Sequence, residues 1–126
     1  MIDALFNQPG YVGAKKMLDA TVLRHEAIAS NLANLGTPNY KRLDVAPAFA
    51  TNLSQAMLSQ DASGIASLKP ELAVDASATG SSGDGNTVQL ESELIRLNQN
   101  SMEHTLETQL VTSSLLRLRT AITGRS

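Results

Sequence analysis

Residues 87–122, TVQLESELIRLNQNSMEHTLETQLVTSSLLRLRTAI, carry the pattern that decides the fold. Positions separated alternately by four and three residues run through this stretch for more than four heptads: Leu90, Leu94, Leu97, Ser101, His104, Thr108, Val111, Leu115, Leu118 and Ile122. This spacing places side chains on one face of an α-helix and is typical of a coiled-coil seam. The sequence therefore predicts a C-terminal helix over residues 87–126. The polar centre of its seam, at Ser101, His104 and Thr108, either restricts the register of pairing or lies at a wetter part of the helix.

A second apolar row lies beside this seam, so that more than one side of the C-terminal helix can pack against a partner. It consists of Ile95, Met102, Leu106, Leu110 and Leu116. We expect the helix to begin near Asn86 or Thr87, because an Asn at the N-cap places Gln89 at N3, where both side chains satisfy free backbone groups.

A second long helix is predicted near the N-terminus, within residues 1–36. The same alternation of four and three runs from residue 11 to residue 35, through Ala14, Leu18, Thr21, His25, Ile28, Leu32 and Leu35. Gly36 accounts for the end of this helix, since glycine adopts the left-handed conformation after a helix without a Cβ penalty. Pro38 cannot continue a helix.

The middle segment, residues 37–86, is expected to be irregular and partly extended. Leu43, Val45, Pro47 and Phe49 alternate, and Pro47 limits this stretch to an edge strand or an extended arm. Residues 49–58 have the spacing of a short helix, and residues 68–74 read as a short extended piece. Residues 76–87 are a low-complexity loop rich in Gly and Ser, which we expect to be flexible.

These elements predict a mainly α fold in which the two terminal helices pack as an antiparallel coiled coil and form one domain. The chain has 126 residues, no Trp, two Phe and two Tyr, which favours helix-on-helix seams over a thick core. A two-helix pair cannot cover an apolar surface wider than one seam. Leaving four large aliphatic side chains exposed forgoes roughly 6–12 kcal/mol, as much as the whole stability of a small domain. We therefore expect self-association.

Composition argues against several classes of function. The net charge of −2, with an acidic middle between mildly basic ends, gives no reason to expect nucleic acid. No span approaches the roughly 18 apolar residues of a membrane helix, and the first residues lack the pattern of a cleavable signal peptide. The absence of Cys excludes disulfides and thiolate zinc sites.

No chemistry of catalysis or cofactor binding emerges from the residues. His25 and His104 lie on helix stripes without the spacing of a metal site, so we expect no metal. The stretch from Asp84 to Val88 lacks the alternating ligands of a calcium loop. The glycines of residues 80–85 lack the Lys and Ser or Thr that hold a nucleotide phosphate. We therefore predict no catalytic residues, no cofactor, no small-molecule substrate and no enzyme activity.

The stretch 28–41, IASNLANLGTPNYK, closely resembles the N-terminal signature of bacterial flagellar rod and hook proteins. In that family a helix ends in Ala-Ser-Asn-apolar-Ala-Asn and is followed by a turn like Thr-Pro-Gly-Tyr-Lys. Here Asn39 stands where Gly is usual, a residue that also tolerates a positive φ. Within the family the chain is similar to the proximal rod proteins, by its short length, by residues 84–88, DGNTV, and by residues 115–122, LLRLRTAI. His104 stands near where relatives tend to have Tyr.

The resemblance implies a structural subunit of the flagellar basal-body rod, whose terminal helices form a tubular layer around the export channel. It implies other rod subunits, the rod adaptor protein and the inner-membrane ring with its export gate as partners, and export without signal cleavage. From the residues alone, the alternative is a soluble two-helix adaptor or export chaperone.

The expected assembly interface combines the seams and the signature. It comprises Leu18, Ile28, Asn31, Leu32, Asn34, Gly36, Pro38, Tyr40, Leu90, Leu94, Leu97, His104, Val111, Leu115, Leu118 and Ile122. Asn31 and Asn34 are expected to offer amide hydrogen bonds across a packed interface.

Overall fold

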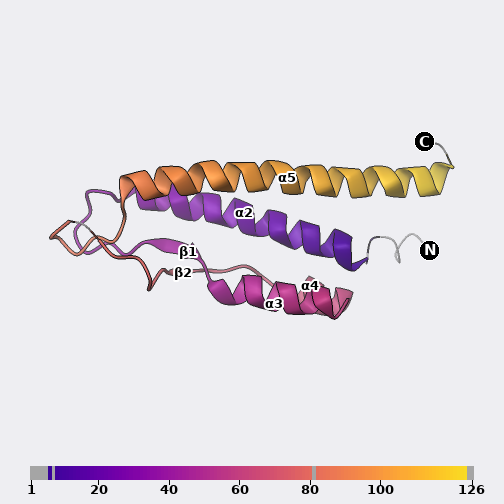
Figure 1. Cartoon of the computed structure of the whole chain (residues 1–126), viewed down its shortest axis with the longest axis horizontal. Helices are drawn as coiled ribbons and strands as arrows, with labels where there is room; N and C mark the ends of the chain where they lie inside the picture. Colours follow the sequence, from indigo (N-terminus) through magenta and orange to yellow (C-terminus); the bar gives the residue numbers. More distant parts are fainter. Residues whose placement is uncertain (1–5, 7, 81, 125–126) are drawn as a thin grey trace.

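The computed structural model describes residues 6, 8–80 and 82–124. Two long helices, α2 (Pro9–Ala33) and α5 (Leu90–Thr123), lie side by side and run in opposite directions. Between them in sequence come β1 (Leu43–Val45), α3 (Pro47–Leu58), α4 (Ala62–Ser67) and β2 (Leu72–Val74). These four short elements lie on the other side of α2 from α5, so that α2 is the central layer (Figure 1). The predicted mainly α fold with two long antiparallel terminal helices is confirmed.

Helix α2 can occupy the centre because two neighbouring rows of small or apolar residues repeat along it every seven positions. One row, Gly13, Ala20 and Ala27, is buried, and Ala20 belongs to the core formed with the middle segment. At Gly13 a Cβ atom would lie 2.9 Å from the sulfur of Met57 in α3, so glycine allows this close approach. The other row, Ala14, Thr21 and Ile28, is also buried, and Thr21 contacts α5. Thr21, a residue of the predicted N-terminal seam, thus faces α5.

The main hydrophobic core lies between α2 and the middle segment rather than between the two long helices. Ala20, Val45, Phe49, Leu53 and Ile65 form it, and all five are buried. The short helix predicted over residues 49–58 is confirmed as α3, which starts two residues earlier because Pro47 fits the first turn of a helix.

The middle segment is more regular than the sequence suggested. β1 and β2 pair antiparallel, with Leu43 opposite Val74 and Val45 opposite Leu72. A two-stranded ladder leaves both strands at an edge, as predicted for the stretch around Pro47. The pairing and α4 were not anticipated, since three-residue strands and a six-residue helix leave little periodicity to detect.

The seam of α5 against α2 is rotated from the predicted one. Leu97 and Val111 are half-buried and Leu118 is buried, but Leu90, Leu94, Leu115 and Ile122 are exposed. Another set of residues, spaced by seven, is covered on α5 in place of these leucines. They are polar and are all buried or half-buried: Glu93, Asn100, Glu107 and Ser114. The prediction was wrong here because Glu93 pairs with the buried Arg42, and Nδ2 of Asn100 donates to the backbone oxygen of Thr21.

Candidate functional site

The end of α2, strand β1 and the start of α5 meet in a dense polar cluster, which we call the joint. Asn31 of α2 lies at its centre and is fully buried. Its Nδ2 donates to the backbone oxygen of Leu43 (2.9 Å) and to Oε2 of Glu93 (3.2 Å), and its Oδ1 accepts from the Leu43 amide (2.9 Å). The hydroxyl of Tyr40 also donates to Oδ1 (3.3 Å) and shares a hydrogen bond with Ser30 (2.9 Å). Asn31 was expected to form amide hydrogen bonds across a packed interface; in the structure these bonds join parts of the same chain.

A buried arginine supplies the charge of the joint. Arg42 is 3% exposed, and its Nε donates to the carboxylate of Glu93, which is fully buried. Its Nη1 contacts Oδ2 of Asp44 (3.0 Å) and Oδ2 of Asp75 (2.7 Å). Burial opposes the charge of Arg42, but the hydrogen bonds and charges of Glu93 and Asp44 outweigh it and raise the pKa of the guanidinium. The ion pairs therefore fasten β1, the stretch after β2, and α5 together.

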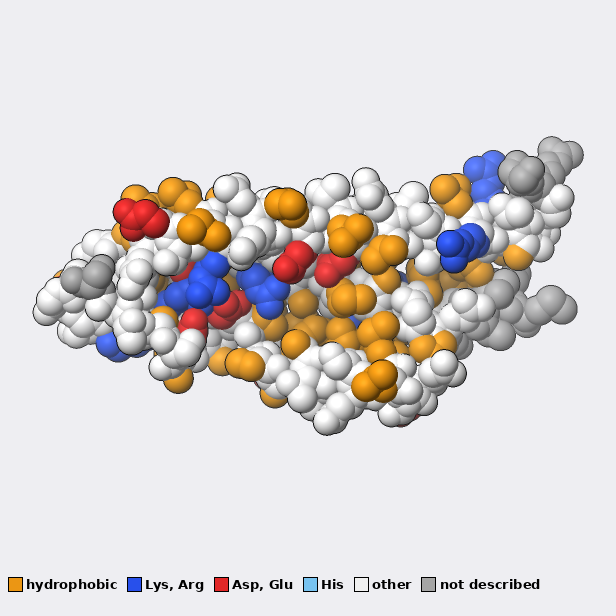
Figure 2. All heavy atoms as spheres, viewed as in Figure 1, with side chains coloured by type: hydrophobic (Ala, Val, Ile, Leu, Met, Phe, Trp, Pro, Cys, Tyr) orange, Lys and Arg blue, Asp and Glu red, His pale blue; other side chains and the backbone are white. Residues whose placement is uncertain are grey.

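The carboxylates around Arg42 respond in the opposite direction. Burial would raise the pKa of Asp44, but the Val45 amide and the guanidinium groups of Arg42 and Arg24 lower it overall. Hydrogen bonds from Ser77 are the main cause that lowers the pKa of Asp75. Both carboxylates are thus held in the charged form that Arg42 requires. Figure 2 shows charged side chains gathered between α5 and the strands.

The free carbonyl groups at the end of α2 are satisfied by a residue distant in sequence. Nδ2 of Asn86, which is buried, donates to the backbone oxygens of Asn34 (2.8 Å), Leu35 (3.2 Å) and Thr37 (2.8 Å). Its Oδ1 accepts from the Val88 amide (2.8 Å). The predicted role of Asn86 as a cap of the C-terminal helix was wrong: α5 begins at Leu90, and no side chain caps it. Asn86 caps α2 instead.

The turn after α2 does not use Gly36 as the sequence suggested. Helix α2 ends at Ala33, and among the described residues the glycines with positive φ are Gly85 and Gly124. Asn39, at the position where the family usually has Gly, adopts the positive φ (62°), as anticipated for Asn. The Asn39 amide donates to the backbone oxygen of Asp84 (2.9 Å), so the end of the low-complexity loop binds the signature turn. Gly36 and Pro38 are exposed.

The remaining residues of the expected interface fall into three groups. Ile28 of α2 and Leu118 of α5 are buried. Four further residues of these two helices are half-buried: Leu18, Leu32, Leu97 and Val111. Within the signature, Asn34 donates to the backbone oxygen of Ser30 (2.8 Å). Leu90, Leu94, Leu115 and Ile122 lie on the surface of α5, between 42% and 55% exposed.

The face of α5 turned away from the seam carries what we call the outer row. Its members are Ile95, Met102, Leu106, Leu110 and Leu116, each between 46% and 73% exposed. Hydrophobic side chains are visible along the length of α5 in Figure 2. Two apolar surfaces of α5, the outer row and the flank with Leu94 and Leu115, are therefore open to water in a single molecule.

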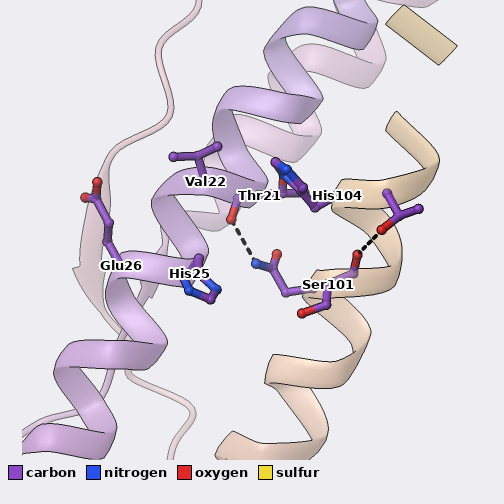
Figure 3. Close-up of a pocket in the computed structure, with 8 residues that line it drawn as sticks. Thr21, Val22, His25, Glu26, Ser101 and His104 are labelled. Carbon is purple, nitrogen blue, oxygen red and sulfur yellow. Dashed lines mark hydrogen bonds between the residues drawn. The ribbon is translucent and has the colours of Figure 1, made fainter. Parts of the chain in front are cut away.

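A hollow of about 510 Å3, which we call the central groove, lies half-way along the helix pair. Thr21, Val22 and His25 line it from α2, and Asn100, Ser101, His104 and Thr105 from α5. Figure 3 shows His104 reaching toward Thr21, and the two side chains share a hydrogen bond (3.1 Å). His25, on α2, points toward α5. His104, an expected interface residue, thus belongs to the pair of long helices and to this groove.

One carboxylate of the seam lies in an unfavourable setting. Burial and the nearby Glu103 raise the pKa of Glu107, although a hydrogen bond from Thr21 and the charge of Arg24 act in the opposite direction. Oε2 of Glu107 is buried and has no hydrogen-bond partner. The charged form of this side chain is therefore disfavoured in the folded chain.

Sequence reasoning missed Arg42, Glu93 and Asn100 as structural determinants, and it assigned Asn86 to the wrong helix. The seven-residue spacing of Glu93, Asn100 and Glu107 was a signal, because it marks one helical face as surely as a row of leucines does. In the part of the chain that the structure describes, no group of three or more metal-ligating His, Asp or Glu side chains occurs. Among the same residues, no helix has the length and hydropathy needed to span a membrane.

The chain is similar to two flagellar rod proteins. It is 33% identical over 115 residues to the flagellar basal body rod protein FlgB of Borrelia hermsii, a match that covers 77% of this chain and 83% of that protein. The chain belongs to the FlgB family. The FlgB protein of Borreliella burgdorferi is 29% identical over 113 residues, covering 75% of this chain and 82% of its own length. No family model matches the chain.

The joint lies inside the region shared with FlgB. A continuous match over 77% of a chain of 126 residues includes roughly residues 30–97 wherever it begins. This range contains Asn31, Arg42, Asn86 and Glu93. The expectation of a rod-type protein, which came from the signature at residues 28–41, is confirmed at the level of the FlgB family.

Proposed function

We propose that the chain is a structural subunit of the flagellar basal-body rod, in its proximal part. It assembles through its terminal helices into a tubular layer around the export channel, and it transmits torque rather than catalysing a reaction. Its partners are further rod subunits, the rod adaptor protein and the inner-membrane ring with its export gate. It reaches this place by flagellar export without a cleaved signal peptide.

The observation that supports this proposal is the exposed apolar surface of α5 in a chain of the FlgB family. The five side chains of the outer row and four more leucine and isoleucine side chains on the flank of α5 are about half exposed. At about 25 cal/mol per Å2 of apolar area, burial of each such side chain by a neighbour would contribute on the order of 1 kcal/mol. Surface patches of this extent mark protein interfaces.

The test separates folding from assembly by substituting one exposed and one half-buried leucine. Leu115→Asp places a charge on the exposed flank of α5, so the purified chain should fold normally but fail to join isolated basal bodies and fail to support motility. Leu97→Asp places a charge in the seam and should impair folding itself. Ser82→Asp, in the loop before α5, is the matched control and should leave both properties unchanged.

Localisation decides between the proposed function and the adaptor alternative. A rod subunit remains with the basal body after detergent extraction of the membranes, whereas an adaptor stays in the soluble fraction. Recovery of the wild-type chain only in the soluble fraction, or full motility with Leu115→Asp, would rule out the assembly surface proposed here.

A further inference from the structure

The outer row lies on the side of α5 that faces away from α2. In Figure 1, α2 runs along one side of α5, and the opposite side is free of other helices and strands. The two largest apolar side chains near the middle of this side are well exposed, Met102 at 73% and Leu106 at 58%. Large apolar side chains gathered in water along one helix face indicate a contact surface.

Six side chains on this face are spaced alternately by four and three residues, which is the spacing of a coiled-coil seam. They are all exposed, and we call them the symmetric seam: Ile95, Gln99, Met102, Leu106, Gln109 and Ser113. Their spacing is the same in either direction from the midpoint between Met102 and Leu106. The symmetric seam of one copy therefore matches that of a second copy whose helix runs in the opposite direction.

The chemistry of the symmetric seam is matched about the same midpoint. In an antiparallel pair, Met102 of each copy faces Leu106 of the other, so that two large apolar side chains meet. Gln99 of each copy faces Gln109 of the other. Each glutamine amide carries both donors and an acceptor, so the two side chains satisfy each other.

The ends of the symmetric seam favour the antiparallel direction over the parallel one. In an antiparallel pair, Ile95 of each copy faces Ser113 of the other, so that a large side chain fills the space beside a small one. In a parallel pair in register, each residue faces its own counterpart, and two Ser113 side chains leave a gap between the helices. Unfilled space in an interface loses van der Waals contacts.

The charges beside the symmetric seam also suit an antiparallel pair. Glu91 and Arg119 are exposed and four heptads apart, so they lie along the same edge of the seam. Neither forms an ion pair within the described part of the chain. Antiparallel pairing brings Glu91 of each copy beside Arg119 of the other. Near the midpoint, Glu103 already pairs with Arg24 of its own chain (3.5 Å), which reduces its repulsion of a second Glu103.

We propose that two copies of this chain pair through their symmetric seams, with the two α5 helices antiparallel about a two-fold axis. A two-fold contact closes at two copies, whereas growth of a rod requires contacts that propagate. The dimer is therefore a form of the free chain, in which the outer row is shielded from water. It goes beyond the proposed rod function and does not depend on it. In a rod subunit, this pair has to open before the outer row meets other subunits.

Disulfide trapping tests the direction of pairing, since the chain has no cysteine. Ile95→Cys and Ser113→Cys replace two exposed residues that face each other in the antiparallel pair. Mixed under mild oxidation, the two variants should give a cross-linked dimer. Neither alone should, because like positions then lie about 27 Å apart at about 1.5 Å per residue. The double variant should give dimers and no higher multimers. Leu58→Cys on α3, 87% exposed, is the matched control and should not cross-link with Ser113→Cys.

Exchange of charges tests the two flanking ion pairs. Arg119→Glu places two acidic side chains together at each end of the dimer and should weaken dimerisation about fivefold or more at low salt. Glu91→Arg should have a similar effect, and the chain with both substitutions should recover the wild-type dissociation constant. Analytical ultracentrifugation measures these constants. Glu71→Arg, the same charge reversal on the exposed surface of the middle segment, is the control and should leave dimerisation unchanged.

The possible outcomes separate this inference from the rod function. A monomeric wild-type chain, cross-linking of either cysteine variant with itself, a ladder of multimers from the double variant, or no recovery on charge exchange would each overturn the antiparallel dimer. If the chain nevertheless remains with basal bodies, the rod function stands and only the dimer is wrong. If the dimer forms but the chain is absent from basal bodies, the dimer stands and the rod function is wrong.

The shielding of the outer row has its own test. The doubly cross-linked dimer should join isolated basal bodies only after its disulfides are reduced, because the outer row is covered until then. Joining in the oxidised form would overturn the shielding.

Discussion

The joint and the distal half of α5 differ in how their side chains are accommodated: polar side chains are buried in the joint, and apolar side chains are exposed on the distal half. In the joint, Asn31, Arg42, Asn86 and Glu93 are almost fully buried, and their polar groups are met largely by other parts of the chain. Beyond residue 101, α5 has one buried side chain among its described residues, Leu118, and six of its large apolar side chains are exposed among polar ones. Within one molecule the joint leaves one of these polar groups, Nη2 of Arg42, without a hydrogen-bond partner, whereas the distal half leaves its large apolar side chains open to water.

This difference indicates how the work of the chain is divided. Buried ionic and amide groups specify one geometry, because any other arrangement leaves them without partners. The joint therefore sets the angle at which the middle segment and the helix pair meet. The exposed rows of α5 contribute little to that geometry and are available to neighbours. Substitutions in the joint should consequently change stability, and substitutions on the outer surface should change association.

The largest effect is expected from Arg42→Met. It leaves the fully buried carboxylate of Glu93 without its cation, and breaking a buried pair in this way costs about 3–5 kcal/mol of the free energy of unfolding. Chemical denaturation followed by circular dichroism measures it. The matched control is Arg96→Met, because Arg96 is 44% exposed and lies 3.8 Å from Asp44, so its loss should cost at most about 1 kcal/mol. Equal effects of the two substitutions would remove the distinction between the joint and the surface.

The next effect in size concerns the cap of α2. Asn86→Ala leaves the backbone oxygens of Asn34, Leu35 and Thr37 without their shared donor and should cost about 1–3 kcal/mol. Hydrogen exchange of the amides in the last turn of α2 should accelerate together with those of residues 39–42. Asn98→Ala, on the exposed surface of α5, is the control and should change stability by less than about 0.5 kcal/mol. Unchanged exchange at the end of α2 would contradict the capping role.

Gly85 and Gly36, two glycines near the joint, are expected to differ in their tolerance of a side chain. Gly85 has a φ of 79°, and a Cβ there would collide with Oδ1 of Asn39, so Gly85→Ala should cost roughly 1–3 kcal/mol. Gly36 has no positive φ, and a Cβ there would meet nothing within 4 Å, so Gly36→Ala should be nearly neutral. Thermal unfolding of the two variants measures the difference. A larger loss at Gly36 would restore the helix-end role that the sequence suggested for it.

The sequence was sufficient for the long helices and not for the contacts between them. Alternating spacing identified both helices, because a helical face repeats at every third or fourth residue whatever surrounds it. The choice between Leu94 and Glu93 for the seam depended on Arg42, which is distant in sequence and supplies the countercharge that makes burial of Glu93 possible. Similarly, the role of Asn86 depended on carbonyl groups 49–52 residues away. A pattern confined to one helix contains neither fact.

The smallest effect is expected from Glu107→Gln, in the part of the seam that lies within the distal half of α5. Because the folded chain raises the pKa of Glu107 above its ordinary value of 4.5, the folded state favours the protonated form, and that contribution to stability is lost as the pH rises through the folded pKa. Gln resembles the protonated form, so the variant should be more stable than the wild type at pH 7, by about a few tenths of a kcal/mol for a solvent-screened group. The two proteins should be equally stable below about pH 4. Denaturation at both pH values, with the exposed Glu71→Gln as control, measures this. A variant less stable than the wild type at pH 7 would show that the Glu107 carboxylate has a partner in the seam that outweighs its burial.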